Sequence, residues 1–207
     1  MMDKARITGL AELERPAWFH ALNHKAVARS IAGKIGKKYE DCNFIVAHLG
    51  SGISICATRR KDGGWFRRSH QRSVLSGALR FSADYPLVQL CYSGKYTESE
   101  MVDKISKFAG MYDFLGTKDS REIEKRIEEG DGKAALVYDA FIYETAKEIC
   151  SYIPAFDEPV DRIIVTGGIA HSKKVTSELQ RMTQNVAPME VVAGEYEMIA
   201  LALGDFV

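Results

Sequence analysis

The spacing of apolar side chains changes from helical to strand-like near residue 40. Over residues 19–37 they recur every three or four positions, which places them on one face of an amphipathic helix. Two short apolar runs follow, Phe44–Leu49 and Ile53–Thr58, and Gly50-Ser51-Gly52 separates them. The pattern predicts a helix, a strand, a glycine turn and a second strand.

Helices and strands alternate through the rest of the chain. Helical spacing recurs over residues 87–92, 98–108, 120–129 and 131–152. Thr97 and Glu100 have the spacing of a capping box at the start of the second of these segments. A β-branched run begins at Val160 and leads into a double glycine, which predicts a strand and a turn. A helix is predicted next, over residues 172–181. A strand over residues 189–192 and a terminal helix follow. The alternation predicts the α/β class.

Composition limits the classes of function. The 207 residues are 46% hydrophobic and carry 28 basic and 28 acidic side chains, so the formal net charge is zero. This balance argues against a dedicated nucleic-acid or membrane-surface binder. No apolar stretch reaches the roughly 18 residues of a membrane span, and the first residues lack the apolar core of a signal peptide. We therefore expect a cytoplasmic protein with no nucleic-acid and no membrane partner.

The cysteines are expected to be ordinary reduced thiols. They are widely spaced, at Cys42, Cys56, Cys91 and Cys150. Without a C-x-x-C pair, neither a zinc site nor a disulfide framework is indicated.

Two glycine turns each follow an apolar strand, at Gly50-Ser51-Gly52 and at Gly167-Gly168. Small residues let backbone amides approach an anion closely, as phosphate binding requires. A single such turn often uses glycine only for its backbone freedom, but two in one α/β chain favour a phosphate site. Neither turn matches the sequence of a P-loop or of a dinucleotide-binding loop, so a nucleotide would be held differently.

Histidines form a second group of candidate residues. His20 and His24 are four positions apart on the predicted first helix and share one face. Such a pair can ligate a metal or donate to a transferring phosphoryl group, but the glutamate of the H-E-x-x-H metal motif is absent. His48 ends an apolar strand just before the first glycine turn, and it is either a core histidine or a site residue.

Two charged segments have alternative interpretations. Glu195 and Glu197 lie near the start of the terminal helix, where carboxylates either complement the helix dipole or ligate magnesium. A basic window interleaved with aromatic residues is either a solvated loop or a single-stranded nucleic-acid site. Its basic residues are Arg59, Arg60, Lys61, Arg67, Arg68, Arg72 and Arg80.

Collinear motifs over nearly the whole chain resemble the butyrate kinase family, in the acetate kinase branch of the actin-like ATPase superfamily. The motifs lie at residues 6–10, 14–16, 19–29, 45–54, 91–96, 115–117, 166–170 and 194–198. The resemblance implies an actin-like ATPase domain, which is ribonuclease H-like and has a mixed sheet with helices on both sides. It also implies an enzyme, a carboxylate-accepting phosphotransferase that uses ATP and Mg²⁺ to make an acyl phosphate from a short-chain fatty acid.

The resemblance implies a role for each candidate residue. His20 assists phosphoryl transfer, and Asn23 lines the same face. His48 faces the nucleotide phosphates, and Glu197 matches the acidic position linked to magnesium. The two glycine turns bind the nucleotide: the phosphates lie at Gly50, Ser51 and Gly52, and the adenosine side lies at Gly167, Gly168, Ile169 and Ala170. The acyl chain stays open among acetate, propionate, butyrate and branched acids.

The first departure from the family is the absence of an N-terminal domain with a phosphate loop of the N-P-G-S-T type. Residues 1–40 are therefore interpreted as a helical remnant leading in from that domain, and residues 41–207 as the C-terminal nucleotide-binding domain. Kinases of this kind close two domains over ATP. We expect the isolated chain to be inactive and to require the missing domain or to self-associate. The alternative is a non-catalytic nucleotide-binding or interaction module.

The second departure lies at residues 64–86, where the family has an acidic, glycine-rich loop and this chain is rich in arginine. Family-like sequence on both sides suggests a pair of compensating frameshifts. A coding sequence whose other frames give no family-like peptide there would refute this hypothesis. Arg80 is a weak counterpart of the family's loop arginine.

Overall fold

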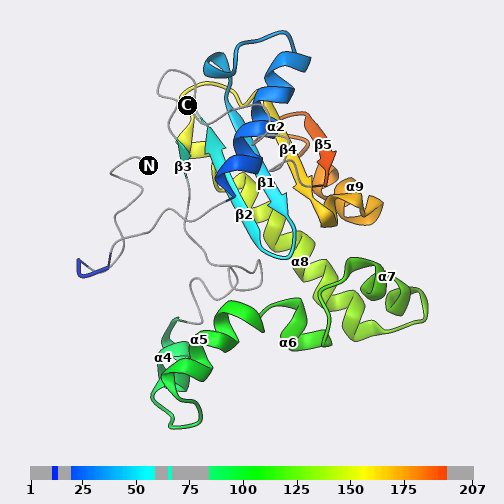
Figure 1. Cartoon of the computed structure of the whole chain (residues 1–207). Coiled ribbons are helices and arrows are strands. Elements are labelled where there is room, and N and C mark those ends of the chain that lie inside the picture. Colours follow the sequence, from blue (N-terminus) through cyan, green and yellow to red (C-terminus); the bar gives the residue numbers. More distant parts are fainter. Residues whose placement is uncertain (1–10, 14–19, 59–64, 67–83, 195–207) are drawn as a thin grey trace. The chain divides into compact units, whose positions relative to one another are not determined.

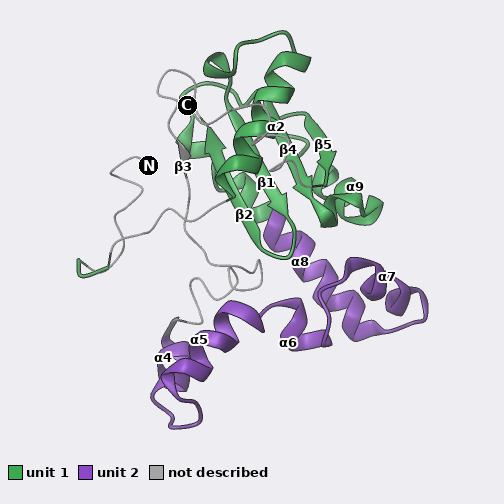
Figure 2. Cartoon of the chain, viewed as in Figure 1, with its two compact units in different colours: residues 1–69, 146–207 green, residues 70–145 purple. Residues whose placement is uncertain are grey.

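The structure is a computed structural model that describes residues 11–13, 20–58, 65–66 and 84–194. Most of the basic window, most of the segment interpreted as frameshifted, Glu195, Glu197 and the predicted terminal helix lie outside these residues. The chain divides into two compact units, residues 1–69 with 146–207, and residues 70–145 (Figure 2). The boundary predicted at residue 40 separates a segment leading in from a preceding domain from the nucleotide-binding domain. It is a different kind of boundary from that between the two compact units, and it stays a prediction.

The first unit contains a mixed β-sheet whose described strands have the order β3-β2-β1-β4-β5 (Figure 1). The strands are β1 (Phe44–Leu49), β2 (Ile53–Thr58), β3 (Trp65–Phe66), β4 (Arg162–Gly167) and β5 (Met189–Ala193). β1 pairs with β2 as an antiparallel hairpin, and β2 pairs with β3 in the same way. β4 runs parallel to both of its neighbours, β1 and β5.

Helix α2 (Ala21–Lys34) covers one face of this sheet. Side chains alternate between the faces of a strand, so Phe44 and Val46 point toward α2 together with Cys56 and Ile164. They pack against the apolar stripe of the helix, which consists of Val27, Ala28, Ile31 and Ala32. The predicted amphipathic helix is thereby confirmed, and it ends at Lys34 because Gly36 has a left-handed φ of +70°.

The opposite face of the sheet is buried as well. Ile45, Ala47, Ile163 and Val165 are fully buried, although they alternate with the residues that face α2. The C-terminal part of α8 (Gly132–Cys150) passes behind the sheet in Figure 1, and the Tyr152 hydroxyl that follows it donates to the Ile55 carbonyl at 2.7 Å. Helix α9 (Lys173–Thr183) buries Val175 and Leu179. Helices therefore lie on both sides, as expected for the α/β class.

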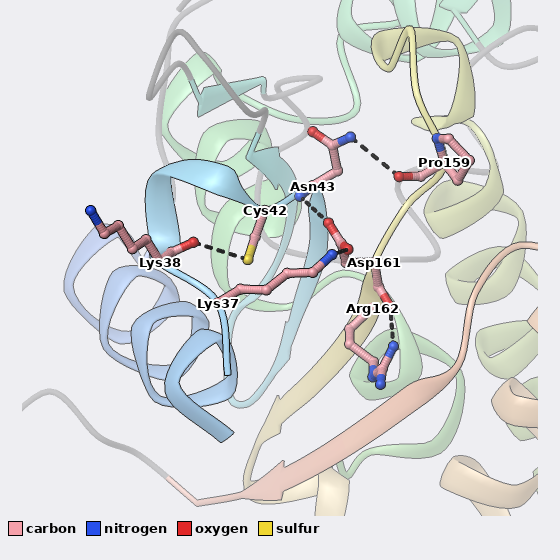
Figure 3. A network of polar contacts seen from close by, with 7 residues as sticks. All are labelled: Lys37, Lys38, Cys42, Asn43, Pro159, Asp161 and Arg162. Carbon is pink, nitrogen blue, oxygen red and sulfur yellow. Dashed lines mark hydrogen bonds and ion pairs between the residues drawn. The ribbon is translucent and has the colours of Figure 1, made fainter. Parts of the chain in front are cut away.

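Asp161 joins the starts of the two central parallel strands (Figure 3). Its Oδ2 accepts the backbone N–H of Asn43 at 2.8 Å, and its own N–H donates to the Asn43 carbonyl at 2.8 Å. Its Oδ1 pairs with Lys37 Nζ at 2.5 Å, just beyond the end of α2. Asn43 Nδ2 completes the network by donating to the Pro159 carbonyl at 3.2 Å. One carboxylate thus fixes β1, β4 and the end of α2 together.

The second unit is helical in the part that the structure describes. It contains α4 (Asp84–Cys91), α5 (Glu98–Lys107), α6 (Met111–Leu115), α7 (Ser120–Glu128) and the first part of α8. The predicted capping box is confirmed, since Thr97 Oγ1 accepts the Glu100 N–H and Glu100 accepts the Thr97 N–H. Arg126 links its neighbours by donating to the Leu115 carbonyl and to Asp131 just before α8.

Some short elements had no counterpart in the prediction. α6 has only five residues, and β3 only two, so neither is long enough for a period to emerge. Three single turns of 3₁₀ helix, η1 (Tyr39–Asp41), η2 (Ile153–Ala155) and η3 (Gly168–His171), occupy connections. In contrast, the predicted bounds of β1 and β2 match those of the structure.

Candidate functional site

The two glycine turns lie at one edge of the sheet. β1 and β4 are adjacent and parallel, so their carboxyl ends, and the turns that follow them, are side by side. Gly167 approaches β1 so closely that a Cβ on it would lie 2.5 Å from the Leu49 carbonyl oxygen. Its φ of +93° also belongs to the region that favours glycine. Glycine at position 167 therefore lets the second turn lie against the first.

The first turn covers two histidines. Gly50 N–H donates to the Gly52 carbonyl at 3.2 Å, and Ser51 between them is exposed. A Cβ on Gly50 would lie 2.7 Å from His48 Nε2. A Cβ on Gly52 would lie 3.5 Å from His20 Cε1 and 3.6 Å from His20 Nε2. The absence of side chains at the two glycines thus opens the turn toward both imidazoles.

The three histidines predicted as a group come together between α2 and the hairpin. His20, the residue before α2, stacks on His48 with the ring centroids 4.1 Å apart. His24 lies one helical turn further on, with its ring 6.4 Å from that of His48. The prediction that His20 and His24 share one face is confirmed, since both contact Ser54 of β2.

His48 is held as a neutral imidazole. It is 2% exposed, and burial together with the neighbouring His20 lowers its pKa to about 4 from an ordinary 6.5. Its Nδ1 has no hydrogen-bond partner among the residues that the structure describes. A neutral His48 adds no charge beside the stacked His20 ring.

Asn23 is the remaining candidate on α2. The structure buries it completely, and neither its Oδ1 nor its Nδ2 has a hydrogen-bond partner within the described part of the chain. A buried amide without partners is uncommon and costs free energy.

The second turn begins at Gly167 and continues into η3. Gly168 is exposed and has open space where a Cβ would stand, whereas Ile169 and Ala170 are buried. Gly194 lies beside this turn, because Gly167 and Gly194 exchange two backbone hydrogen bonds of 3.0 and 3.1 Å. The motif that contains Glu197 therefore starts next to the second turn, although Glu197 itself lies outside the described residues.

Two residues of the site were not identified from the sequence. Ser54 pairs directly with His48 across the hairpin, and Cys56 pairs with Val46, so both side chains point toward α2. Ser54 contacts His20 and His24, and Cys56 contacts His24. The signal that could have found them is the hairpin register. A three-residue turn between two six-residue runs places the residues at 48 and 54 opposite each other.

The described segments contain neither a metal-binding cluster nor a membrane-spanning helix. No three His, Cys, Asp or Glu side chains there are arranged to hold a metal ion. None of the described helices is long and apolar enough to cross a membrane.

Relatives in sequence agree with the resemblance. The model of the acetokinase family matches residues 13–191. Butyrate kinase 1 of Clostridium acetobutylicum is 41% identical over 98% of this chain, and butyrate kinase 2 of the same organism is 40% identical over 99%. The chain spans 58% of the length of each of these two relatives.

Solved structures agree with the fold. Acetate kinase of Porphyromonas gingivalis superposes with a TM-score of 0.80 at 18% identity, covering 98% of this chain and 59% of that protein. A propionate kinase from Francisella tularensis gives a TM-score of 0.71 at 20% identity, covering 88% of this chain and 53% of that protein. The expected actin-like ATPase fold is confirmed. Because the family model matches most of the sequence and the sheet has this fold, the chain belongs to the acetokinase family.

Proposed function

We propose that the protein acts in phosphoryl transfer from ATP to a short-chain carboxylate such as butyrate. A carboxylate oxygen attacks the γ-phosphorus, the bond from that phosphorus to the β–γ bridging oxygen breaks, and acyl phosphate and ADP are formed. The single observation that carries the proposal is that two glycine turns lie together at one edge of the sheet, next to the stacked rings of His20 and His48. In such a transfer, the protein mainly positions the reactants and stabilises the charge on the equatorial oxygens.

Each part of the site has a proposed task. The backbone at Gly50, Ser51 and Gly52 would face the nucleotide phosphates, since no side chain blocks their approach. Residues 167–170 would border the adenosine, where Gly168 leaves open space. His20 would donate a hydrogen bond to the transferring phosphoryl group, with Asn23 on the same helix. His48, a buried neutral imidazole at the first turn, would face the nucleotide phosphates.

Magnesium enters this proposal only through the nucleotide. Bound to ATP, it would neutralise charge on the β- and γ-phosphates. The described residues contain no cluster of ligands for the ion itself. Glu197 stays the proposed acidic residue near it.

The rest of the machinery would come from outside these 207 residues. We interpret residues 41–207 as the C-terminal nucleotide-binding domain and residues 1–40 as the segment leading in from a preceding domain. A separate domain or a second copy of the chain would then close over ATP. We place the protein in the cytoplasm, where its proposed substrate ATP is available.

Nucleotide binding by the 207-residue chain tests the proposal. Ser51 is exposed, so its substitution leaves the core intact. In Ser51→Asp, a carboxylate about 5 Å from one phosphate charge costs about 0.8 kcal/mol even at the dielectric constant of bulk water, which raises the dissociation constant of Mg-ATP at least about fourfold. Titration calorimetry measures this change.

Ser51→Ala is the matched control, because it removes the hydroxyl without adding charge. Its dissociation constant is expected to stay within about twofold of the wild-type value, as for most surface substitutions. The proposal fails if the wild-type chain does not bind Mg-ATP, or if Ser51→Asp binds it as tightly as Ser51→Ala does.

A further inference from the structure

A continuous line of hydrogen bonds runs from the interior of the sheet to the first glycine turn. Cys56 Sγ lies 2.6 Å from His24 Nδ1, and His24 Nε2 lies 3.0 Å from Ser54 Oγ. Ser54 Oγ in turn lies 2.7 Å from His20 Nδ1. Two further atoms of the His20 ring, Cε1 and Nε2, face Gly52. Three buried side chains therefore lead to an imidazole edge at the turn.

Two periodicities create this line. His20 and His24 are one helical turn apart along α2, while Ser54 and Cys56 are two residues apart on β2 and so share a face. A helix laid along a strand brings the two pairs into contact. His24, Ser54 and Cys56 are at most 4% exposed, so water does not compete for their hydrogen bonds.

The hydroxyl of Ser54 determines how the protons are arranged. It has one proton to donate and two lone pairs that accept. The His20 backbone N–H already donates to one lone pair at 3.4 Å. With both imidazoles neutral, one ring must donate to Ser54, and the other must accept its proton.

The two distances from Ser54 indicate which ring accepts. A hydroxyl donor typically gives a heavy-atom distance of about 2.7–2.8 Å, whereas an N–H donor gives about 2.9–3.0 Å. The distance to His20 is 2.7 Å and the distance to His24 is 3.0 Å. The shorter distance favours Ser54 as donor to His20 Nδ1, with His24 Nε2–H donating to Ser54.

Cys56 extends the same direction of hydrogen-bond donation by one residue. As a thiol, Cys56 has one S–H to donate. His24 carries its proton on Nε2 in this arrangement, which leaves Nδ1 to accept the Cys56 S–H. The three contacts then share one direction of donation, from Cys56 to His24, from His24 to Ser54 and from Ser54 to His20.

We propose that Cys56 and His24, acting through Ser54, are positioning residues that hold neutral His20 with its proton on Nε2, directed at the first glycine turn. If His20 takes up a second proton on Nδ1, that N–H donates to Ser54, and the Nε2–H still faces the turn. His20 presents an N–H at the turn in both states. For the proposed phosphoryl transfer, on which this role rests, the turn would always meet a donor.

Nitrogen-15 NMR of the 207-residue chain tests this arrangement without nucleotide. Long-range correlation spectra distinguish the Nε2–H from the Nδ1–H tautomer of each neutral histidine. They are recorded at about pH 7.5, above the ordinary imidazole pKa of about 6.5 and below the ordinary thiol pKa of about 8.5, and each signal is assigned by single histidine substitution. We expect His20 and His24 to show the Nε2–H form alone.

Substitutions in the line should allow His20 to populate both neutral tautomers. Ser54→Ala removes the donor to Nδ1 and is expected to give a detectable Nδ1–H form of His20, whereas Ser54→Thr keeps the hydroxyl and the single form. Cys56→Ala removes the donor to His24 Nδ1, so we expect a detectable Nδ1–H form of His24 and, through Ser54, of His20. Cys56→Ser restores a donor and should restore the single Nε2–H form. Thr58→Val is the matched control, since Thr58 is a buried hydroxyl on the same face of β2 but outside the line.

Several results would overturn the proposal. One is a wild-type His20 with its proton on Nδ1. Another is a folded Ser54→Ala or Cys56→Ala variant whose His20 signals match the wild-type signals, or a Thr58→Val variant that shifts them equally. If the Ser54 variants do not fold, the wild-type spectrum and the comparison of Cys56→Ala with Cys56→Ser still test the proposal. Because no nucleotide is present, these results are independent of whether the chain binds Mg-ATP.

Discussion

At the scale of single residues, the two adjacent glycines after β4 have different reasons to be glycine. A Cβ at Gly167 would lie 2.5 Å from the Leu49 oxygen and 2.9 Å from its nitrogen, both of them backbone atoms that cannot turn aside. A Cβ at Gly168 would meet nothing within 4 Å. Position 167 is therefore constrained by packing and backbone conformation, and position 168 is not.

Gly167→Ala is expected to lower the free energy of unfolding by more than about 2 kcal/mol. The left-handed backbone conformation alone costs about 1–2 kcal/mol for an L-residue, and the contact with β1 adds to it. Urea denaturation followed by circular dichroism measures the loss. Gly168→Ala is the paired control and is expected to stay within about 0.5 kcal/mol of wild type. Equal losses in the two variants would refute the assignment.

At the scale of elements, Asp161 decides how β1 and β4 align. Parallel neighbours cannot be joined by a tight turn, so their register needs a tie between segments distant in the sequence. The carboxylate provides it, with one oxygen on the Asn43 N–H and the other on Lys37 Nζ. Because the glycine turns are at the far ends of these two strands, the same tie positions the site.

Asp161→Ala is expected to cost about 1–3 kcal/mol of folding stability, since it leaves the buried Asn43 N–H without its acceptor. Lys37→Ala removes only the exposed ion pair and is expected to cost less than about 1 kcal/mol. Thermal or urea unfolding of the two variants separates these contributions. A Lys37→Ala loss as large as that of Asp161→Ala would mean that the ion pair, and not the backbone contact, holds the strands.

At the scale of the whole molecule, the chain spans 58% of the length of its butyrate kinase relatives. Kinases that close two domains over ATP need both walls to exclude water and to complete the site. We therefore expect weak or no butyrate-dependent formation of ADP by the 207 residues alone. Trapping the acyl phosphate with hydroxylamine measures turnover directly. Robust turnover by the isolated chain would show that these residues contain a complete site.

How far the sequence could predict each element depended on how local its cause is. β1 and β2 were predicted with their bounds because apolar runs between glycines specify them directly. The capping box of α5 was predicted for the same reason, since Thr97 and Glu100 are three residues apart. α6 was missed because its five residues contain too little of a helical period. Asp161 was missed because its partner Asn43 is 118 positions away.

The sequence by itself determined the α/β class, the two glycine turns, the shared face of His20 and His24, and the family. All of these follow from spacing within short segments or from collinear motifs. Only the tertiary structure decided that the turns lie side by side, that His48 is kept neutral, and that Ser54 and Cys56 connect to His20. The physical reason is that strand pairing and helix packing bring together residues about 30 to 120 positions apart, and the desolvation they cause sets the protonation of what they enclose.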